Sequence, residues 1–237
     1  MNRRDQPDPV RRRRAPDLPD TADPDLLDRS ARAGLRSLPE SLAAKVASHL
    51  VAAGQLIDDD PKTALAHAAF ARQLAPRLAV VREAVAIAAY RNSDYAGALA
   101  DFRALRRMTG DPAYLPVMAD CERGLGRPDR AIALGREVEA SALDPAGKVE
   151  LAIVVSGARR DRGEFEAAVA VLGPLVKTKL VRPWTARLWY AYAEALLAAG
   201  RRDEAASWFA SAAEVDADDE TDADERAGAV VSEAEQD

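Results

Sequence analysis

The chain of 237 residues has few of the residue types on which many sites and folds depend. One cysteine and two histidines exclude a disulfide framework and any cysteine-based zinc or iron–sulfur site within the chain. Aromatic residues make up only 5%, which argues against a β-sandwich or β-barrel. No apolar run reaches the roughly 18 residues of a membrane span, and Asp and Pro follow the basic N-terminus where a signal peptide would be apolar. We therefore expect a cytoplasmic protein with a reduced thiol and no membrane partner.

Alanine and unevenly distributed charge are what the chain has in abundance. The 52 alanines favour closely packed helices. The net charge is +4 over residues 1–16, −5 over 17–28, +5 over 29–213 and −10 over 214–237. We predict a disordered Arg/Pro/Asp-rich leader over 1–22 and an N-terminal helix within 23–44 that leads into the body. The acidic tail, 216–237, is predicted to be mostly disordered, with a weak helix where apolar residues follow helical spacing at Ala227, Val230, Val231 and Ala234.

Turn signals divide the body into short helices. Asp-Pro pairs stand at 23–24, 60–61, 111–112 and 144–145, and Leu38-Pro39 and Arg182-Pro183 add two similar boundaries. An Asp N-cap followed by Pro is a physical start signal, because the carboxylate accepts a backbone N–H that would otherwise lack a partner. Helix-length segments rich in Ala, Leu, Val and Arg lie between these boundaries, and no segment has the pattern of a strand.

The helices form a repeat that is marked by small residues. An anchor alanine opens each second helix, at intervals of 34, 33, 37 and 37 residues: Ala64, Ala98, Ala131, Ala168 and Ala205. A small residue precedes each anchor by twelve positions: Ala52, Ala86, Ala119, Ser156 and Ala193. Another small residue follows each of these two positions later: Gly54, Ala88, Cys121, Ala158 and Ala195. Two helices approach closely only where small residues meet, so these positions predict helix pairs that stack on one another.

The pattern resembles the tetratricopeptide repeat (TPR) family. Repeat 186–219 matches the family's favoured positions best, with Trp189, Ala193, Gly200, Ala205, Phe209 and Ala212. Four further repeats follow the same frame over 45–78, 79–112, 112–145 and 149–182. Two departures are Ala68 and Gly135 at a position that favours aromatics, and Gly173-Pro174 should kink or shorten a second helix. The resemblance implies an all-α fold, a right-handed α-solenoid of about five TPR-like helix pairs over 45–215.

In TPR proteins, fixed positions of each first helix face a concave groove. Carried onto this sequence, the candidate groove residues are His49, Glu83, Ile87, Tyr90, Asp120, Arg123, Glu150, Arg160, Arg187, Tyr190 and Glu194. Arginine pairs with carboxylates in a bidentate manner and tyrosine is a rigid contact, so both are typical anchors of a binding surface. The resemblance thus implies a non-enzymatic scaffold or adaptor that binds a peptide or a partner helix.

Two other functions remain open at this level. The Arg11–Arg14 run and surface arginine pairs are compatible with a nucleic-acid- or ribosome-associated protein. Alternatively, the last repeat has no evident cap and could form a homodimer through its exposed end. An enzyme is disfavoured, because no set of acid, base, nucleophile or metal ligands is visible. We expect no cofactor and no metal, and we interpret Cys121 as a buried, inert thiol.

Overall fold

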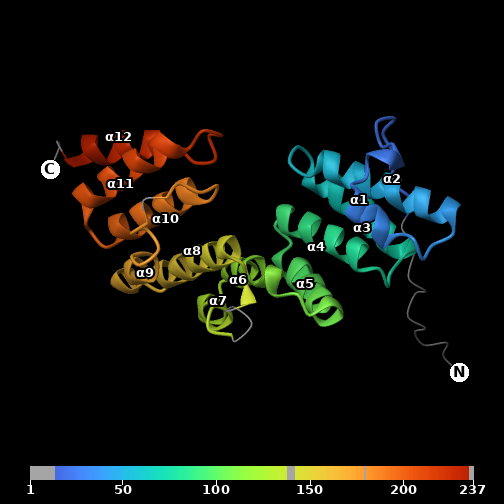
Figure 1. Ribbon diagram of the computed structural model, residues 1–237, viewed down its shortest axis with the longest axis horizontal. Coiled ribbons are helices and arrows are strands. Elements are labelled where there is room, and N and C mark those ends of the chain that lie inside the picture. Colours follow the sequence, from blue (N-terminus) through green and yellow to red (C-terminus); the bar gives the residue numbers. More distant parts are fainter. Residues whose placement is uncertain (1–13, 138–141, 179, 235–237) are drawn as a thin grey trace, which may run out of the picture. The chain divides into compact units, whose positions relative to one another are not determined.

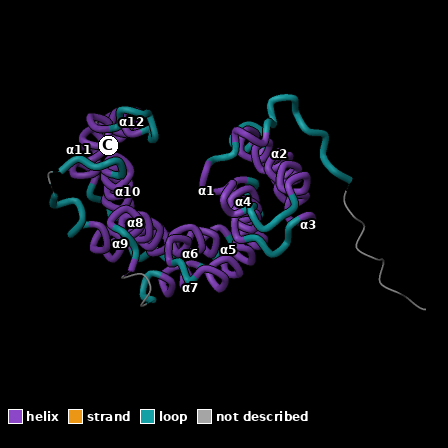
Figure 2. The backbone as a smooth tube through the Cα atoms, turned by 45° about the vertical axis from the view of Figure 1, so that its right-hand side comes forward, coloured by secondary structure: helices purple, strands orange, loops and turns teal. Residues whose placement is uncertain are grey.

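The computed structural model describes residues 14–137, 142–178 and 180–234. The chain divides into two compact units, unit 1 up to Gly110 and unit 2 from Asp111 onward. Helices account for all the regular structure within the described ranges, and no strand occurs there (Figures 1 and 2). The predicted all-α class is confirmed. In the same described part of the chain, no helix is long and apolar enough to cross a membrane.

Unit 1 consists of two helix pairs preceded by a short N-terminal segment. Its elements are the 3-10 helix η1 (Pro24–Leu26) and the helices α1 (Arg29–Gly34), α2 (Glu40–Leu56), α3 (Pro61–Leu74), α4 (Ala79–Arg91) and α5 (Tyr95–Thr109). Helix α2 pairs with α3 and α4 pairs with α5, while α3 also packs on α4. The two pairs correspond to the predicted repeats 45–78 and 79–112, although α2 begins five residues before its repeat.

Unit 2 continues the pattern with three helix pairs and a final helix. Its elements are the 3-10 helix η2 (Pro112–Tyr114) and the helices α6 (Leu115–Gly124), α7 (Pro128–Leu134), α8 (Pro145–Asp161), α9 (Phe165–Leu172), α10 (Thr185–Ala198), α11 (Arg202–Val215) and α12 (Ala223–Ala234). The pairs are α6/α7, α8/α9 and α10/α11, and the first helices α6, α8 and α10 also contact one another in that order. Helix α9 stops at Leu172, as the Gly173-Pro174 sequence predicts.

Most of the predicted helix starts are correct, and their chemistry is the expected one. Asp60 accepts the backbone N–H of Thr63 at the start of α3, and Asp144 accepts that of Gly147 at the start of α8. The Asp111-Pro112 signal opens only the 3-10 turn η2, and α10 begins two residues after Pro183. Glycines 126, 163 and 200 follow α6, α8 and α10 with φ of 69°, 73° and 77°, a left-handed conformation that lets each first helix turn sharply into its partner.

The small-residue positions lie where the helices meet. All five anchor alanines have 0% exposed surface, and the small residues twelve positions earlier are at most 1% exposed. Between α8 and α9 the contact also includes a hydrogen bond, in which the Ser156 hydroxyl donates to the Ala168 carbonyl over 3.1 Å. Gly54 departs from the prediction, because it is exposed and nothing lies within 4 Å of where its side chain would be. Four of the five predicted pairs therefore use the second small position for close packing, and the first does not.

The two charged ends of the chain are more ordered than predicted, where the structure describes them. Ala22 is buried against Val51 and Ala52, so the segment predicted to be disordered up to residue 22 contacts α2 at its end. In the tail, α12 packs on α11 and buries Ala223 and Val230, with exposed fractions of 1% and 3%. The weak helix of the prediction is thus a packed helix that covers the end of the last repeat. The start of the leader, 1–13, and the last residues, 235–237, lie outside the described residues.

Candidate functional site

Seven of the predicted groove residues lie together on the first helices of unit 2. These are Asp120 and Arg123 on α6, Glu150 and Arg160 on α8, and Arg187, Tyr190 and Glu194 on α10. We call this set the first-helix surface of unit 2. Its charged side chains form ion pairs and hydrogen bonds with one another and with three neighbouring charged residues, Asp161, Glu220 and Arg226.

Glu194 on α10 binds two arginines at the C-terminal end of the first-helix surface of unit 2. Its Oε2 accepts from Arg160 Nη1 at 2.8 Å, and its Oε1 accepts from Arg226 Nη2 at 2.5 Å. The Glu194 side chain is only 18% exposed. A carboxylate that is largely removed from water is stabilised when cations satisfy both of its oxygens, so Glu194 holds α8 and α12 to α10.

Arg123 connects α6 to α8 at the other end of the surface. Its Nε lies 2.8 Å from Asp161 Oδ2, and its Nη1 lies 3.1 Å from Asp120 Oδ1. Burial alone would lower the pKa of Arg123, but the two carboxylates outweigh it and the pKa is raised. Gly157 provides the space, because a Cβ there would lie 2.7 Å from Arg123 Cζ. The absence of a side chain at Gly157 thus lets the Arg123 guanidinium lie directly against α8.

Arg187 and Tyr190 connect α10 to its neighbours on both sides. Arg187 Nη2 donates to Glu150 Oε1 at 2.5 Å, and its Nε lies 3.6 Å from Glu220 Oε2 in the loop before α12. The Tyr190 hydroxyl is hydrogen-bonded to Asp222. Burial first, then this bond and the charge of Glu194, raise the pKa of Tyr190 to about 12. Two acids of the tail thus lie against residues that were predicted as binding anchors.

The partners in this network are separated by about one repeat in sequence. The spacing is 38 residues for Arg123–Asp161, 37 for Glu150–Arg187, 34 for Arg160–Glu194 and 32 for Glu194–Arg226. Arg123, Glu150, Arg160, Arg187 and Glu194 lie on first helices, but the sequence did not predict their pairing or the partners Asp161 and Arg226. Opposite charges one repeat apart are the signal that would have found the pairs.

In unit 1, three candidate residues share one face of α4 at helical spacing, namely Glu83, Ile87 and Tyr90, and the fourth, His49 on α2, is buried. Ile87 on α4 is 38% exposed, as a groove residue should be. Tyr90 lies near the end of α4, where its ring centroid is 6.0 Å from that of Tyr95, and Glu83 lies half-buried in the middle of the helix. His49 is 1% exposed and points toward α3, so its prediction as a groove residue is wrong.

His49 forms a buried pair with His67. Their Nδ1 atoms are 2.9 Å apart, and the Phe70 ring centroid lies 4.6 Å from that of His49. One Nδ1 donates and the other accepts, which requires opposite tautomers of two neutral rings. Burial first, then the charges of His67 and Lys45, lower the pKa of His49 to about 4, and burial lowers the pKa of His67 as well. The pair is part of the α2–α3 packing.

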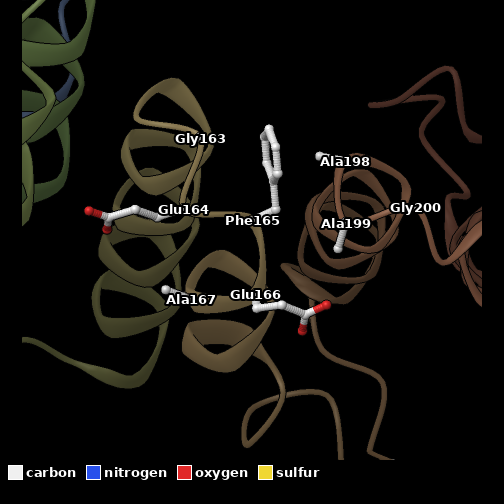
Figure 3. Close-up of a pocket in the computed structure, with 8 residues that line it drawn as sticks. All are labelled: Gly163, Glu164, Phe165, Glu166, Ala167, Ala198, Ala199 and Gly200. Atoms are coloured by element: carbon white, nitrogen blue, oxygen red, sulfur yellow. The ribbon is translucent and has the colours of Figure 1, made fainter.

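A separate cavity of about 600 Å³ lies in unit 2 between the α8–α9 turn and the end of α10 (Figure 3). The Phe165 ring stands between the two helix pairs and is 41% exposed, while Ala198 and Ala199 form the opposite wall. Glu164 and Glu166 point away from the ring. The lining of this cavity is therefore mixed, with apolar carbon from Phe165 and the alanines and two carboxylates from Glu164 and Glu166.

Possible metal ligands do not cluster in the part of the chain that the structure describes. No cluster of three or more His, Cys, Asp or Glu side chains could hold a metal ion within these ranges. Cys121 lies in a small-residue position of α6 with 0% exposed surface, as predicted for an inert thiol.

Stacked helix pairs with small residues at each contact define an α-solenoid of the TPR type. The structure is similar to the crystal structure of a thermophilic TPR protein from Thermus thermophilus, with a TM-score of 0.60. The two share 22% sequence identity over 78% of this chain and 98% of the other. No family model and no curated protein matches the sequence. The likeness shows that the described helix pairs have a TPR-like fold.

Proposed function

We propose that the protein is a non-enzymatic scaffold and that the first-helix surface of unit 2 binds a peptide or a partner helix. The observation that carries this proposal is the network on α6, α8 and α10, which brings seven predicted groove residues to one surface. Their side chains are held in place by neighbouring charges, and a surface that is ordered before binding loses less conformational entropy when a partner arrives. Cytoplasmic location stays a prediction.

The charges of the surface indicate what kind of partner it fits. Cations and anions alternate across it, with Arg123, Arg187 and Glu150 keeping 27%, 45% and 33% of their side-chain surface exposed. A partner that carries charges of both signs can form ion pairs with these arginines and carboxylates, so that none of the charged side chains is left unpaired. Charge complementarity of this kind selects the partner and its register more than it raises affinity.

The alternative of nucleic acid binding has less support. Of the basic groups that suggested it, Arg159 pairs with Glu164, Arg160 pairs with Glu194, and Arg162 pairs with Asp129 and Glu164. These carboxylates neutralise the local positive charge that phosphate contacts require. The observations therefore favour a protein partner.

A pull-down from native cytosol with the full chain tests the proposal. The variant Arg123→Glu/Arg160→Glu/Arg187→Glu reverses three charges of the surface, and we expect it to lose partners that the wild-type protein keeps at 0.2 M salt. Partners bound through phosphates should instead be lost from the wild type itself between 0.05 and 0.2 M salt, by about 10³-fold or more in affinity.

A matched control keeps the number of reversed charges and changes their place. Arg107, Arg130 and Arg136 are exposed arginines outside the first helices α6, α8 and α10. The variant Arg107→Glu/Arg130→Glu/Arg136→Glu should retain the wild-type partners. Identical partner lists for both triple variants would contradict the proposal, provided that circular dichroism shows both to be folded.

A further inference from the structure

In unit 1, the chain itself covers the first helices. Residues 21–38, which we call the N-terminal strap, comprise η1, α1 and their flanking turns and lie against α2 and α4. Ala22 packs beside Val51 and Ala52 near the end of α2, whereas Leu35 packs beside Val46, Ala47 and Leu50 earlier in the same helix. The strap therefore runs antiparallel to α2.

The strap contacts the other helices of unit 1 mainly through three leucines. Leu35 is 2% exposed, and Leu27 and Leu38 pack half-buried around the same cluster. Gly34 lies directly on α4, because a Cβ at this position would be 2.9 Å from Val80 Cγ1. Val46 and Val80 lie on α2 and α4, the first helices of the two pairs in this unit. The strap thus covers an apolar part of these first helices.

Few polar interactions hold the strap to the helices beneath it. Thr21 and Gln55 exchange two hydrogen bonds of 3.0 Å at its beginning. The other polar contacts stabilise the strap internally: Asp28 caps α1, and Arg32 donates to the carbonyls of Asp25 and Leu27. Within the described ranges, its ion pair is also internal, between Arg32 and Asp25 at 3.5 Å. The strap is consequently a small, self-capped helical segment that binds through apolar side chains.

We propose that the N-terminal strap is a displaceable internal ligand of unit 1, and that the partner of this surface is a leucine-bearing helical segment that takes its place. Such a segment carries leucines at the spacing of 27, 35 and 38 and glycine at the place of Gly34. The proposal rests on the proposed function in one respect, namely that first helices of this protein bind helical segments. It adds that in unit 1 the surface is closed until the strap leaves it.

The first test uses a fluorescein-labelled synthetic peptide of residues 22–38 and fluorescence anisotropy with the full chain. In the wild type the tethered strap competes at an effective concentration in the millimolar range. The variant Leu27→Asp/Leu35→Asp, which releases the strap, should bind the peptide at least ten-fold more tightly than the wild type. Equal affinities of the released variant and the wild type would overturn the proposal.

A reversible crosslink provides the opposite variant. An ideal Cβ at residue 34 lies 3.2 Å from Val80 Cβ, close to the separation of about 3.5–4.5 Å that a disulfide spans. The oxidised Gly34→Cys/Val80→Cys protein should not bind the peptide, and reduction should restore the wild-type affinity. Undiminished binding to the oxidised form would contradict displacement.

Two control peptides examine how the segment is recognised. A peptide with Leu27→Asp and Leu35→Asp lacks the apolar contacts, and a peptide with Gly34→Leu would collide with Val80. Both should bind the released variant at least ten-fold more weakly than the native peptide. If the Gly34→Leu peptide bound equally well, the peptide would not occupy the position of the strap, and the proposal would fail.

Hydrogen exchange on the wild-type protein keeps the proposal testable if the released variant does not fold. Backbone amides of residues 29–38 should exchange at least ten-fold faster than those at the centres of α2 and α4, because the strap opens by itself. Equal protection of all three would mean that the strap is an integral part of the unit, which overturns the proposal.

The outcomes for the two surfaces can be told apart. The Arg123→Glu/Arg160→Glu/Arg187→Glu variant changes only unit 2, so its peptide binding in unit 1 should equal that of the wild type. If the pull-down fails while the peptide assay succeeds, the proposed function of unit 2 is wrong and the strap proposal stands. The reverse result would reject the strap proposal alone.

Discussion

At the scale of single residues, the buried histidine pair makes stability depend on pH. Unfolding returns His49 and His67 to their ordinary pKa near 6.5, whereas folding lowers the pKa of His49 to about 4 and also that of His67. The unfolded chain then binds protons that the folded chain does not. The contribution of the pair is complete above pH 6.5 and is lost as the pH falls from 6.5 toward 4. We expect a loss of the order of 2 kcal/mol from the free energy of unfolding between pH 7.5 and 4.5.

Proton NMR can check this directly, because the chain has only two histidines. Their ring signals should titrate with midpoints below the ordinary value of about 6.5 in the folded protein. The variant His49→Leu/His67→Leu should lack the pH dependence of unfolding across this range. A ring signal that titrates near pH 6.5 while the protein remains folded would show that the pair is not buried in solution.

Glu194 is the residue on which the ion-pair network depends most. Replacing it with Gln removes the charge that faces Arg160 and Arg226 while keeping the shape of the side chain. We expect Glu194→Gln to lower the free energy of unfolding by about 1–3 kcal/mol, since two partly buried cations lose their partner. Urea unfolding followed by tryptophan fluorescence measures this change.

An exposed carboxylate of the same unit serves as the control. Glu204 pairs with Arg201 at 2.7 Å but keeps 55% of its side-chain surface exposed. Glu204→Gln should leave the free energy of unfolding nearly unchanged, because an exposed ion pair is screened by water and salt. Equal effects of the two substitutions would mean that the network contributes no more than an ordinary surface pair.

Local patterns explain why the small-residue positions could be predicted and His49 could not. An anchor such as Ala168 must be small because a neighbouring helix passes over it, and this requirement repeats with the period of the chain. The orientation of His49 depends instead on a hydrogen bond to His67, eighteen residues away on another helix. Nothing in the period of the repeat signals that bond.

At the scale of elements, α12 is the helix whose removal should matter most for its size. It covers the last repeat by packing Val230 and Ala227 into a cluster with Phe209 and Tyr190. A chain that stops after Val215 would expose this cluster and leave Arg187 without Glu220. We expect a loss of the order of 2–4 kcal/mol in the free energy of unfolding of unit 2, measured by urea titration.

A shorter truncation distinguishes the contribution of α12 from that of the residues after it. A protein that stops after Ala234 keeps all of α12 and should be as stable as the full chain. If both truncations had the same stability, α12 would not contribute to unit 2 in solution, and the last repeat would be uncapped as the sequence first suggested.

The elements show where sequence patterns were sufficient and where they were not. Asp60 and Asp144 marked helix starts correctly because an N-cap acts within one turn. The order of α12 was underestimated because its spacing shows an apolar face without showing what that face meets. The strap was expected as a helix within 23–44, but its position on α2 and α4 depends on contacts of Leu35 with residues eleven or more positions away.

At the scale of the whole chain, the two units can be followed separately. Trp184, Trp189 and Trp208 all lie in unit 2, whereas the histidine pair lies in unit 1. Tryptophan fluorescence therefore reports on unit 2 alone, and far-ultraviolet circular dichroism reports on both. At pH 7.5 and at pH 5 we expect the fluorescence midpoint in urea to differ little, while the circular dichroism transition broadens toward lower urea at pH 5. Equal shifts of both probes would contradict this expectation.

Of the features of the whole chain, the class of repeat was the one that the sequence predicted best. A period defined by buried alanines is preserved even where aromatic positions such as Ala68 and Gly135 depart from the family pattern. The candidate site was predicted by position for unit 2, because Arg123, Arg160 and Arg187 follow the same frame. Its chemistry was not, since each arginine is engaged by a carboxylate of a neighbouring element.

The charge network also gives the helix pairs of unit 2 a fixed order. Glu194 accepts from a cation about one repeat earlier and from another about one repeat later, so its surroundings are unlike those of any other position. In a chain that lost or duplicated one helix pair, alanines would again face alanines at the helix contacts. The carboxylates, however, would lie beside side chains other than their arginine partners. We therefore expect a chain with a deleted or duplicated helix pair in unit 2 to be destabilised by unpaired charges, even where the packing of its alanines is preserved.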